Sequence, residues 1–200
     1  MSPADTPLTR DRIVDAAADV IRRFGPAKAT VVDVARALGV SHAAVYKHVA
    51  TKAELRHLVV ARWLETIMHP LRAIVAKTGP APARLRRLFD ALVAVKRQRV
   101  AEDPELFAAY RTLAAETQSV VTAHVVELNQ LAAAIIRAGV KEGSFRNVDP
   151  DAAGRSVLVA TSRFHHPAHA AEWRSPGIDA AYEDVWKLLM HGLKAPKPRA

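Results

Sequence analysis

The sequence predicts an all-α protein, and three observations support this fold class. Half of the 200 residues are hydrophobic, with alanine and leucine abundant, and both of these residue types favour helices. Clusters of aromatic and β-branched residues, which strands prefer, are scarce. Apolar residues recur at three- and four-residue spacing, and no stretch alternates as a strand would. We therefore expect helices along most of the chain.

The first helix is expected over residues 10–24, where Gly25 and Pro26 should end it. Five apolar side chains should face inward from this helix: Ile13, Ala17, Val20, Ile21 and Phe24. Further helices are expected at 52–68, 83–101, 104–114, 117–141, 150–165 and 179–193. Pro70 should end or kink the first of these, and Pro167 should break the segment 150–165. The segment 78–82 (Thr-Gly-Pro-Ala-Pro) is typical of a linker.

Residues 30–55 contain two short helical patterns separated by Gly39. Thr30 and Asp33 have the spacing of a capping box at the start of the first pattern, and Gly39 suits the left-handed turn that ends it. Ser41 can cap the second pattern. Thr51 and Glu54 predict a second capping box where the next helix begins. Two short helices around a glycine turn form a helix-turn-helix, which lays its second helix in the DNA major groove.

The segment of about residues 9–60 resembles the N-terminal domain of the TetR family of bacterial transcriptional repressors. Residue type and spacing agree at Ile13, Ala16, Ala17, Phe24, Gly25, Thr30, Val34, Ala35, Leu38, Gly39, Val40, Tyr46, His48, Lys52 and Leu55. Val49 departs from the pattern, because the family often carries phenylalanine after the histidine. This is a modest change in packing.

The resemblance implies a three-helix DNA-binding domain with a helix-turn-helix, followed by a larger helical domain for ligand binding and dimerisation. We expect a disordered arm over 1–8, the DNA-binding domain over 9–55, the ligand-binding and dimerisation domain over 56–194, and a disordered tail over 195–200. The expected partners are a double-stranded DNA operator, a second copy of the chain and a small-molecule effector of unknown identity. Repression relieved by ligand is the usual polarity in the family.

The resemblance also implies roles for the residues of the reading helix. His42, Ala43 and Ala44 would face base edges, behind the Ser41 cap. Phosphates would be held by four side chains: Thr30, Tyr46, His48 and Lys52. Lys47 could contact either a base edge or a phosphate.

An effector pocket should be mostly apolar with a few placed polar groups. On that basis its expected lining is Phe107, Tyr110, His124, Leu128, Phe164 and His165. For His124 the favoured interpretation is a core histidine with satisfied hydrogen bonds, and ligand contact is the alternative; packing is likewise favoured for Phe107 and Tyr110. The segments 150–165 and 179–193 are the candidates for the dimer interface, because the family implies a dimer and small residues such as Ala152 and Ala153 let helices approach. The alternative is that both segments close the core of one chain.

The formal net charge of +9 indicates a polyanionic partner, although solvated surfaces are often basic. Much of the excess lies outside the reading helix, at Arg84, Arg86, Arg87, Lys96, Arg97, Arg99 and the segment 194–199. The chain has no cysteine, which excludes disulfides, thiol catalysis and cysteine-bound metals. We find no unbroken apolar run of about 20 residues and no secretory signal, so we expect a cytoplasmic protein without a membrane partner.

Two other classes of function remain open. The spacing of His165, His166 and His169 could hold a metal, but Pro167 interrupts it and Glu172 is the only nearby carboxylate, so packing at the helix end is favoured. No catalytic motif, metal site or cofactor site is expected, so an enzyme rests on this histidine cluster alone. A basic architectural protein that binds DNA without sequence choice is the other alternative.

Overall fold

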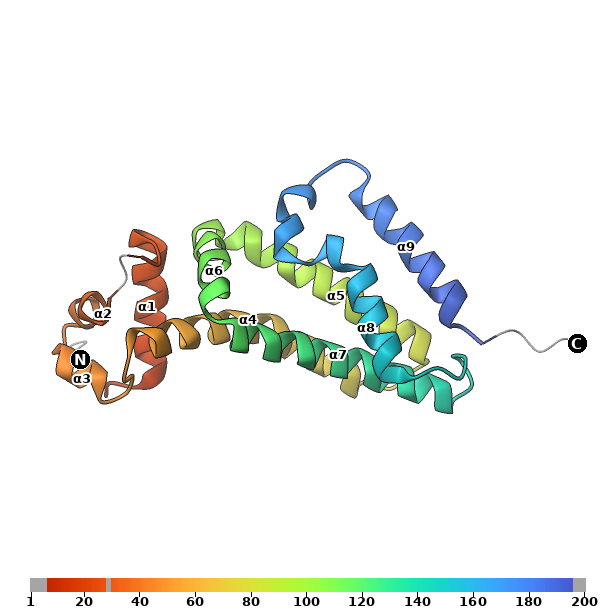
Figure 1. The fold of residues 1–200 in the computed structure, drawn as a ribbon, viewed down its shortest axis with the longest axis horizontal. Helices are drawn as coiled ribbons and strands as arrows, with labels where there is room; N and C mark the ends of the chain where they lie inside the picture. The colour runs from red at the N-terminus through yellow and green to blue at the C-terminus, as the bar shows by residue number, and fades with distance from the viewer. Residues whose placement is uncertain (1–6, 28–29, 196–200) are drawn as a thin grey trace, which may run out of the picture. The chain divides into compact units, whose positions relative to one another are not determined.

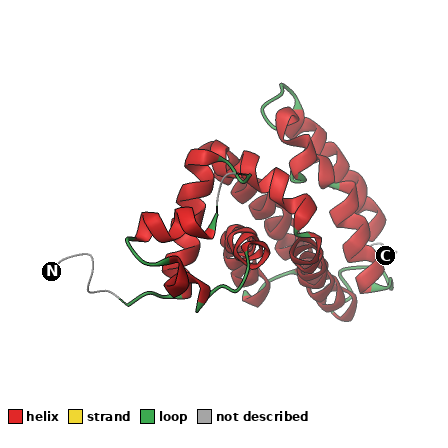
Figure 2. Ribbon diagram, turned by 60° about the vertical axis from the view of Figure 1, so that its left-hand side comes forward, coloured by secondary structure: helices red, strands yellow, loops and turns green. Residues whose placement is uncertain are grey.

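A computed structural model describes residues 7–27 and 30–195. The segments 1–6 and 196–200 lie outside the described residues, and with them most of the expected arm and tail. Figures 1 and 2 show helices and connecting loops, with no strand in the described part of the chain. The helices are α1 (Arg10–Phe24), α2 (Val31–Leu38), α3 (His42–Tyr46), α4 (Lys52–Ala76), α5 (Ala81–Glu102), α6 (Pro104–Glu116), α7 (Gln118–Lys141), α8 (Pro150–Ala160) and α9 (Ile178–Leu193), with 3-10 turns η2 (Ser162–Phe164) and η3 (Pro167–Glu172). The predicted all-α class is confirmed.

The chain forms two compact units that do not follow its order. Unit 1 consists of residues up to 66 together with 100–122, and unit 2 of 67–99 together with 123 onward. Unit 1 therefore contains α1, α2 and α3, the start of α4, and α6. The expected domain boundary after residue 55 stays a prediction, because compactness alone does not define a folding domain.

Helix α1 matches the predicted bounds, and four of its five predicted inward residues are buried. Thr9 caps the helix by accepting a hydrogen bond from the Arg12 backbone N–H at 3.2 Å. The expectation for Phe24 is wrong, because this ring is 59% exposed. Phe24 is the last residue of α1, and the chain turns away immediately at Gly25 with φ 77°. Phe24 instead lines an open groove on unit 1 together with residues of α2.

Pro70 neither ends nor visibly shortens α4, which continues to Ala76. A proline inside a helix removes one backbone hydrogen bond. Pro70 is exposed, so water can satisfy the freed carbonyl, while its neighbours Met68 and Leu71 are buried and hold the helix in place. The expected helix end is therefore wrong, because burial on both sides of the proline outweighs the lost hydrogen bond, and the alternative, a kink at Pro70, stays a prediction.

Unit 2 is held together by close helix contacts and by one partly buried ionic cluster. A methyl group added at Gly154 of α8 would lie 3.2 Å from the backbone of Asn129, so α8 and α7 approach closely. Arg86 of α5 bonds Asp90 at 2.8 Å and Glu183 of α9 at 2.8 Å. Its guanidinium also lies 5.2 Å from the Tyr182 ring centre. These contacts raise the pKa of Arg86 and join α5 to α9.

Helix α8 ends earlier than the predicted segment 150–165. Its last residue is Ala160, and Thr161 leads into η2. The Thr161 hydroxyl donates to the Val157 carbonyl at 2.8 Å, a local bond that competes with helix continuation. Pro167 is the first residue of η3, so it does not cause the end of α8 at Ala160.

Helix α7 is long and apolar enough, by length and composition only, to cross a membrane. The sequence predicts this helix, but the search for an unbroken apolar run did not find it, because polar residues such as Asn129 and Gln130 interrupt the run. The core helix of a soluble protein meets the same criterion, and α7 buries Leu128, Ile135 and Ile136 within unit 2. One such helix is weak evidence for a membrane span.

Substituting Gly139→Ala should destabilise the protein by about 1–3 kcal/mol through overpacking. A methyl group there would collide with the Phe145 ring and lie 2.9 Å from the Ala81 Cβ. Urea unfolding at fixed protein concentration measures the effect. Gln130→Ala on the exposed side of α7 is the control, because that side chain lies outside the core. Equal midpoints for the two variants would show that this close approach is absent in solution.

Candidate DNA-binding surface and effector region

The position of α3 is set by α2 and the turn between them. Gly39 adopts the left-handed conformation, with φ 68° and ψ 28°, and ends α2. Ser41 then caps α3 by accepting a hydrogen bond from the Ala44 backbone N–H at 3.2 Å. Val45 and Val49 are fully buried, with 0% exposed. These two valines anchor α3 by one face and leave the other face outward.

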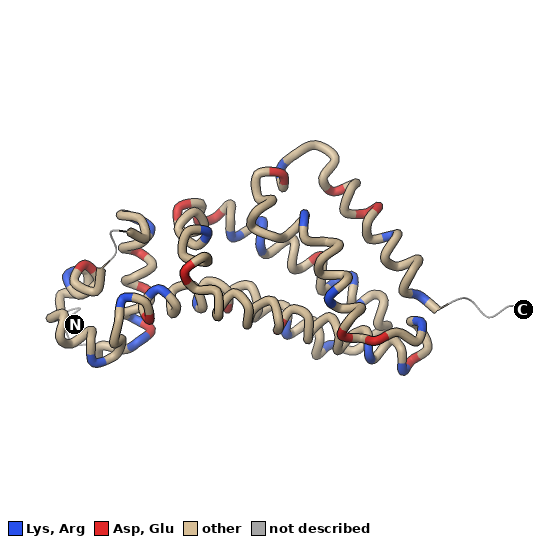
Figure 3. The backbone as a smooth tube through the Cα atoms, in the orientation of Figure 1, with Lys and Arg blue, Asp and Glu red and all other residues tan. Residues whose placement is uncertain are grey.

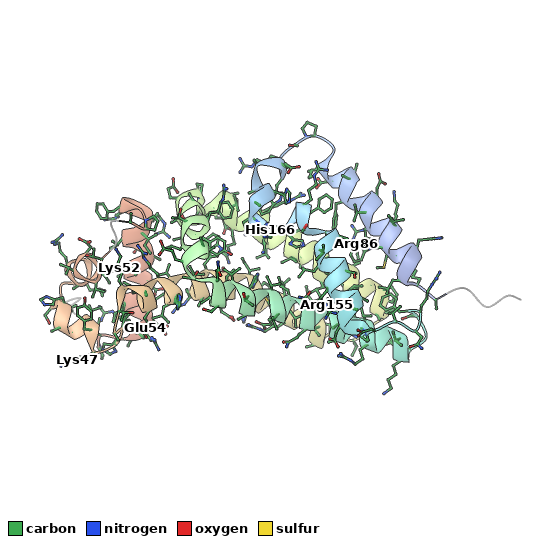
Figure 4. All side chains as sticks on the ribbon, viewed as in Figure 1. Lys47, Lys52, Glu54, Arg86, Arg155 and His166 are labelled. Carbon is green, nitrogen blue, oxygen red and sulfur yellow. The ribbon has the colours of Figure 1, made fainter. Side chains whose placement is uncertain are left out.

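The outward face of α3 presents most of the predicted DNA contacts. Ala44 is half-buried beneath the helix start, and the remaining side chains are exposed: Ser41, His42, Ala43, Tyr46, Lys47 and His48. Figure 4 places Lys47 at the edge of unit 1, beside α3. No ion pair of Lys47 is found in residues 7–27 and 30–195. One short helix thus gathers a donor-rich surface around two small residues.

Thr30 and Lys52 lie at the starts of α2 and α4 and already have protein partners. The Thr30 hydroxyl accepts from the Asp33 backbone N–H at 3.2 Å, and the Asp33 carboxylate accepts from the Thr30 backbone N–H at 3.1 Å, which completes the predicted capping box. The Thr30 hydroxyl also donates to this carboxylate at 2.6 Å. These hydrogen bonds lower the pKa of Asp33. The Lys52 ammonium donates to the Ala27 carbonyl at 3.4 Å. A phosphate would have to replace or share these bonds, so both roles stay predictions.

The start of α4 differs from the predicted second capping box. Thr51 accepts from the Glu54 backbone N–H at 3.0 Å, as expected, but the Glu54 carboxylate accepts from the Ala50 N–H at 2.7 Å instead of the Thr51 N–H. Glu54 also pairs with Arg10 of α1. This ion pair joins elements 44 residues apart, and spacing along the sequence could not indicate it.

Several arginines of unit 1 form ion pairs, and Figure 3 shows Lys and Arg residues interleaved with Asp and Glu along the backbone. Arg62 pairs with Asp11 and Asp15, and Arg36 pairs with Asp33. The net charge of +9 is therefore a weaker guide to the DNA surface than the outward face of α3.

The expected effector lining is divided between the two units. Phe107 and Tyr110 belong to α6 in unit 1, where their ring centres lie 6.5 and 6.1 Å from that of Trp63. Burial raises the pKa of Tyr110. The cavity beside this cluster measures about 10 Å³, the space of roughly one water molecule. In this conformation both rings act as core residues, and ligand contact by them stays a prediction.

The other four expected residues are buried in unit 2. Phe164 packs edge-on against Tyr182, with 5.1 Å between ring centres, and Leu128 lies one turn beyond His124 on α7. The His165 Nε2 lies 3.1 Å from the Thr161 hydroxyl oxygen. Which of the two groups donates depends on the tautomer of His165, and either tautomer can make this hydrogen bond. His165 is therefore a satisfied core histidine.

The favoured interpretation of His124 as a core histidine with satisfied hydrogen bonds is wrong. Neither ring nitrogen finds a hydrogen-bond partner among the described residues, although the side chain is buried. Burial, reinforced by the charge of Lys96, lowers the pKa of both His124 and His165 to about 3. Both imidazoles are neutral at physiological pH.

Lys96 is the residue of interest that the sequence analysis missed, because it was counted among the basic surface residues. It is only 7% exposed, and burial lowers its pKa to about 8. A signal was present in the sequence, since Lys96 continues the apolar spacing of Leu85, Leu88 and Leu92 along the buried face of α5.

The three histidines at positions 165, 166 and 169 each contact a different partner. His165 bonds Thr161, the His166 Nδ1 accepts from the Ala168 N–H at 3.2 Å, and the His169 Nδ1 lies 2.9 Å from Glu172. Within the described ranges, no three side chains of the metal-binding types converge. The cluster packs the η2–η3 segment.

Two surface hollows were not predicted. A groove of about 740 Å³ lies on unit 1, lined by α1 and α2 residues that include Arg12, Asp19 and Arg36. Another of about 310 Å³ lies on unit 2, lined by α8 and the last turns of α9. The second is apolar and contains the side chains of Val157, Leu188 and Leu189.

Comparisons with known proteins cover both regions of the chain. Residues 13–59 match the family described as bacterial regulatory proteins, tetR family, and residues 81–186 match the tetracyclin repressor-like C-terminal domain. The HTH-type transcriptional repressor KstR2 of Rhodococcus jostii (strain RHA1) is 26% identical over 197 residues, covering 94% of this chain and 92% of that protein.

Two solved structures share the fold. The TetR family transcriptional regulator PfmR of Thermus thermophilus is 26% identical with a TM-score of 0.54, covering 96% of this chain and 100% of that one. The transcriptional regulator FadR of Bacillus subtilis, solved in complex with stearoyl-CoA, is 15% identical with a TM-score of 0.64, covering 92% and 99%.

Acid should destabilise the protein through its two buried histidines. Unfolded histidine binds a proton below pH 6.5, whereas His124 and His165 in the folded state do so only near pH 3. Stability is therefore complete above pH 6.5 and falls as the pH drops toward 3, by up to about 1.4 kcal/mol per pH unit for each histidine. Urea unfolding between pH 7 and pH 4 measures this slope.

His124→Leu should make that slope shallower, and His191→Gln on the exposed surface of α9 should leave it unchanged. An unchanged slope in His124→Leu would mean that His124 is hydrated or paired in solution.

Proposed function

The chain belongs to the TetR family of bacterial regulatory proteins, and from this membership we propose that it is a ligand-responsive repressor. It binds a palindromic operator as a homodimer and is released by a small, mostly apolar effector. The observation that carries the proposal is the outward face of α3, which presents His42, Ala43 and Lys47 while Val45 and Val49 are buried. The name of the R. jostii relative supports repression as the polarity.

The length of the reading helix supports a dimer. Helix α3 has 5 residues, so one copy can reach few base edges. A two-fold dimer reads two half-sites, separated by one helical turn of DNA or a multiple of it. Small residues at positions 43 and 44 allow close approach, and a thymine methyl is a fitting contact for Ala44.

The dimer interface is proposed on α8 and α9. Val159 is 71% exposed and Leu188 is 74% exposed, which is unusual for large apolar side chains on two adjacent helices. The apolar groove of about 310 Å³ lies on the same two helices. A second copy packing there would form a bundle with two helices from each chain.

The effector acts by shifting a population between two conformations. Helices α4, α5 and α7 each begin in one unit and end in the other, so a change in unit 2 can pass along continuous helices. The ligand can shift the equilibrium only by its difference in affinity for the two conformations. The stearoyl-CoA bound by the B. subtilis regulator has a long apolar chain, which supports a mostly apolar effector. The site of action is the cytoplasm, and no catalytic step is required.

Lys52→Ala should weaken binding to all DNA sequences and reduce the slope of log affinity against log salt by about 1. The lysine is proposed to hold a phosphate, which carries no sequence information. His42→Ala should instead change which base is preferred at one position of each half-site. Fluorescence anisotropy on operator and random duplexes at several salt concentrations measures both effects.

The control is Lys77→Ala, because Lys77 is an exposed cation that lies outside unit 1. Similar behaviour of the Lys52 and His42 variants on both duplexes would reject the division of roles. A footprint that covers no discrete palindrome would favour the architectural alternative.

Charging the proposed interface should produce monomers. Val159→Glu and Leu188→Glu each place a carboxylate in an apolar contact between chains, and sedimentation equilibrium should show at least a roughly tenfold weaker dimer. Val126→Glu is the matched control, because Val126 is 47% exposed on α7. Dimers that persist in both interface variants would move the interface to another surface.

A further inference from the structure

Lys96 of α5 is a buried cation for which no counter-ion is found in the described residues. The side chain is 7% exposed, and desolvation alone accounts for its lowered pKa, without compensation by any carboxylate. A buried charge without a partner is costly, so proteins rarely keep one without a function. Because its pKa remains about 8, Lys96 is still mostly protonated at neutral pH.

The acidic residues of the neighbouring helices are engaged elsewhere. Asp90, six residues earlier on α5, bonds Arg86 and accepts a hydrogen bond from the Tyr182 hydroxyl, with 3.0 Å between the two oxygens. Asp179 of α9 pairs with Arg97 at 2.7 Å, and Glu127 of α7 pairs with Arg72 at 2.6 Å. None of these carboxylates is free to neutralise Lys96.

His124 of α7 supplies a second unpartnered group close to this charge. The positive charge of Lys96 lowers the pKa of His124, His165 and His166, so these side chains lie within electrostatic range of Lys96 inside unit 2. A neutral imidazole carries one N–H, and the one on His124 has no acceptor in residues 7–27 and 30–195. Buried donors of this kind are rare in folded proteins.

The surroundings of the two donors are apolar. Leu92 lies one turn before Lys96 on α5, and Leu128 lies one turn after His124 on α7. The Phe89 ring lies 6.5 Å from the His165 ring, which is itself fixed by Thr161. Two unpartnered hydrogen-bond donors, one of them charged, thus lie in a core that is apolar apart from Thr161, His165 and the buried side-chain oxygen of Asn129.

We propose that Lys96 and His124 bind the carboxylate of an effector whose remaining body is apolar. The ammonium supplies the opposite charge and the imidazole N–H a second hydrogen bond, so one carboxylate satisfies both buried donors. The inference rests on the proposed function for its regulatory meaning and narrows the effector to anionic amphiphiles. Neutral and cationic ligands of the same size would leave Lys96 uncompensated.

Binding of straight-chain carboxylates from acetate to dodecanoate tests the proposal, with the alcohol and the amine of each chain length as matched probes. Isothermal titration calorimetry without DNA should detect at least one carboxylate, which binds more tightly than its alcohol and its amine. Lys96→Met should weaken that binding roughly 30-fold or more, the usual loss when one member of a buried charge pair is removed. Lys187→Met on the exposed surface of α9 should not.

A second measurement needs no ligand. If Lys96 has no counter-ion in the free protein, Lys96→Met should raise the midpoint of thermal unfolding by about 2 °C or more. A lower midpoint would show that Lys96 is paired in the free protein and would overturn the proposal. The proposal would also be overturned if every carboxylate raised the unfolding midpoints of the wild type and Lys96→Met equally. It would likewise be overturned if no carboxylate raised either midpoint.

The two proposals can fail separately. Carboxylate binding that depends on Lys96 but leaves operator affinity unchanged would retain the anion site and reject its role in release. Absence of operator binding in the ligand-free protein would instead reject the proposed repressor, whatever the calorimetry shows.

Discussion

The reading surface depends on the burial of Val45 and Val49. An isolated helix of fewer than about 12 residues is marginal in water, and α3 has only 5. Its stability therefore comes from these two side chains, each 0% exposed, together with the Ser41 cap. The same burial decides which residues face outward. Any contact with DNA is thus set by apolar packing inside unit 1 more than by the polar residues that make it.

The sequence predicted most of the helices and the reading motif, because local signals determine them. Caps at Thr30 and Ser41 and the left-handed glycine at position 39 act within a few residues, and each has the expected geometry. The family resemblance relies on these same local patterns and is confirmed by the family match over residues 13–59.

The errors arise where distant contacts override local preference. Pro70 is accommodated within α4 because buried neighbours hold the helix, and Phe24 is exposed because it lines an open groove beside α2 instead of the core. Lys96 was interpreted as a surface charge because lysine usually is one, although its position on the apolar stripe of α5 indicated otherwise. The expected effector lining mixes residues of both units, since spacing along separate helices does not indicate which helices meet.

The composition of unit 1 has a consequence for protein engineering. Helix α6 follows α3 by more than about fifty residues, yet it contacts α1, and Arg22 of α1 bonds Asp103 at its cap at 2.6 and 3.0 Å. Phe107 and Tyr110 cover Trp63 of α4. A chimaera that grafts residues 1–66 onto the remainder of another regulator would lose these partners unless the segment 100–122 is transplanted as well. The interchangeable module in this protein is discontinuous in sequence.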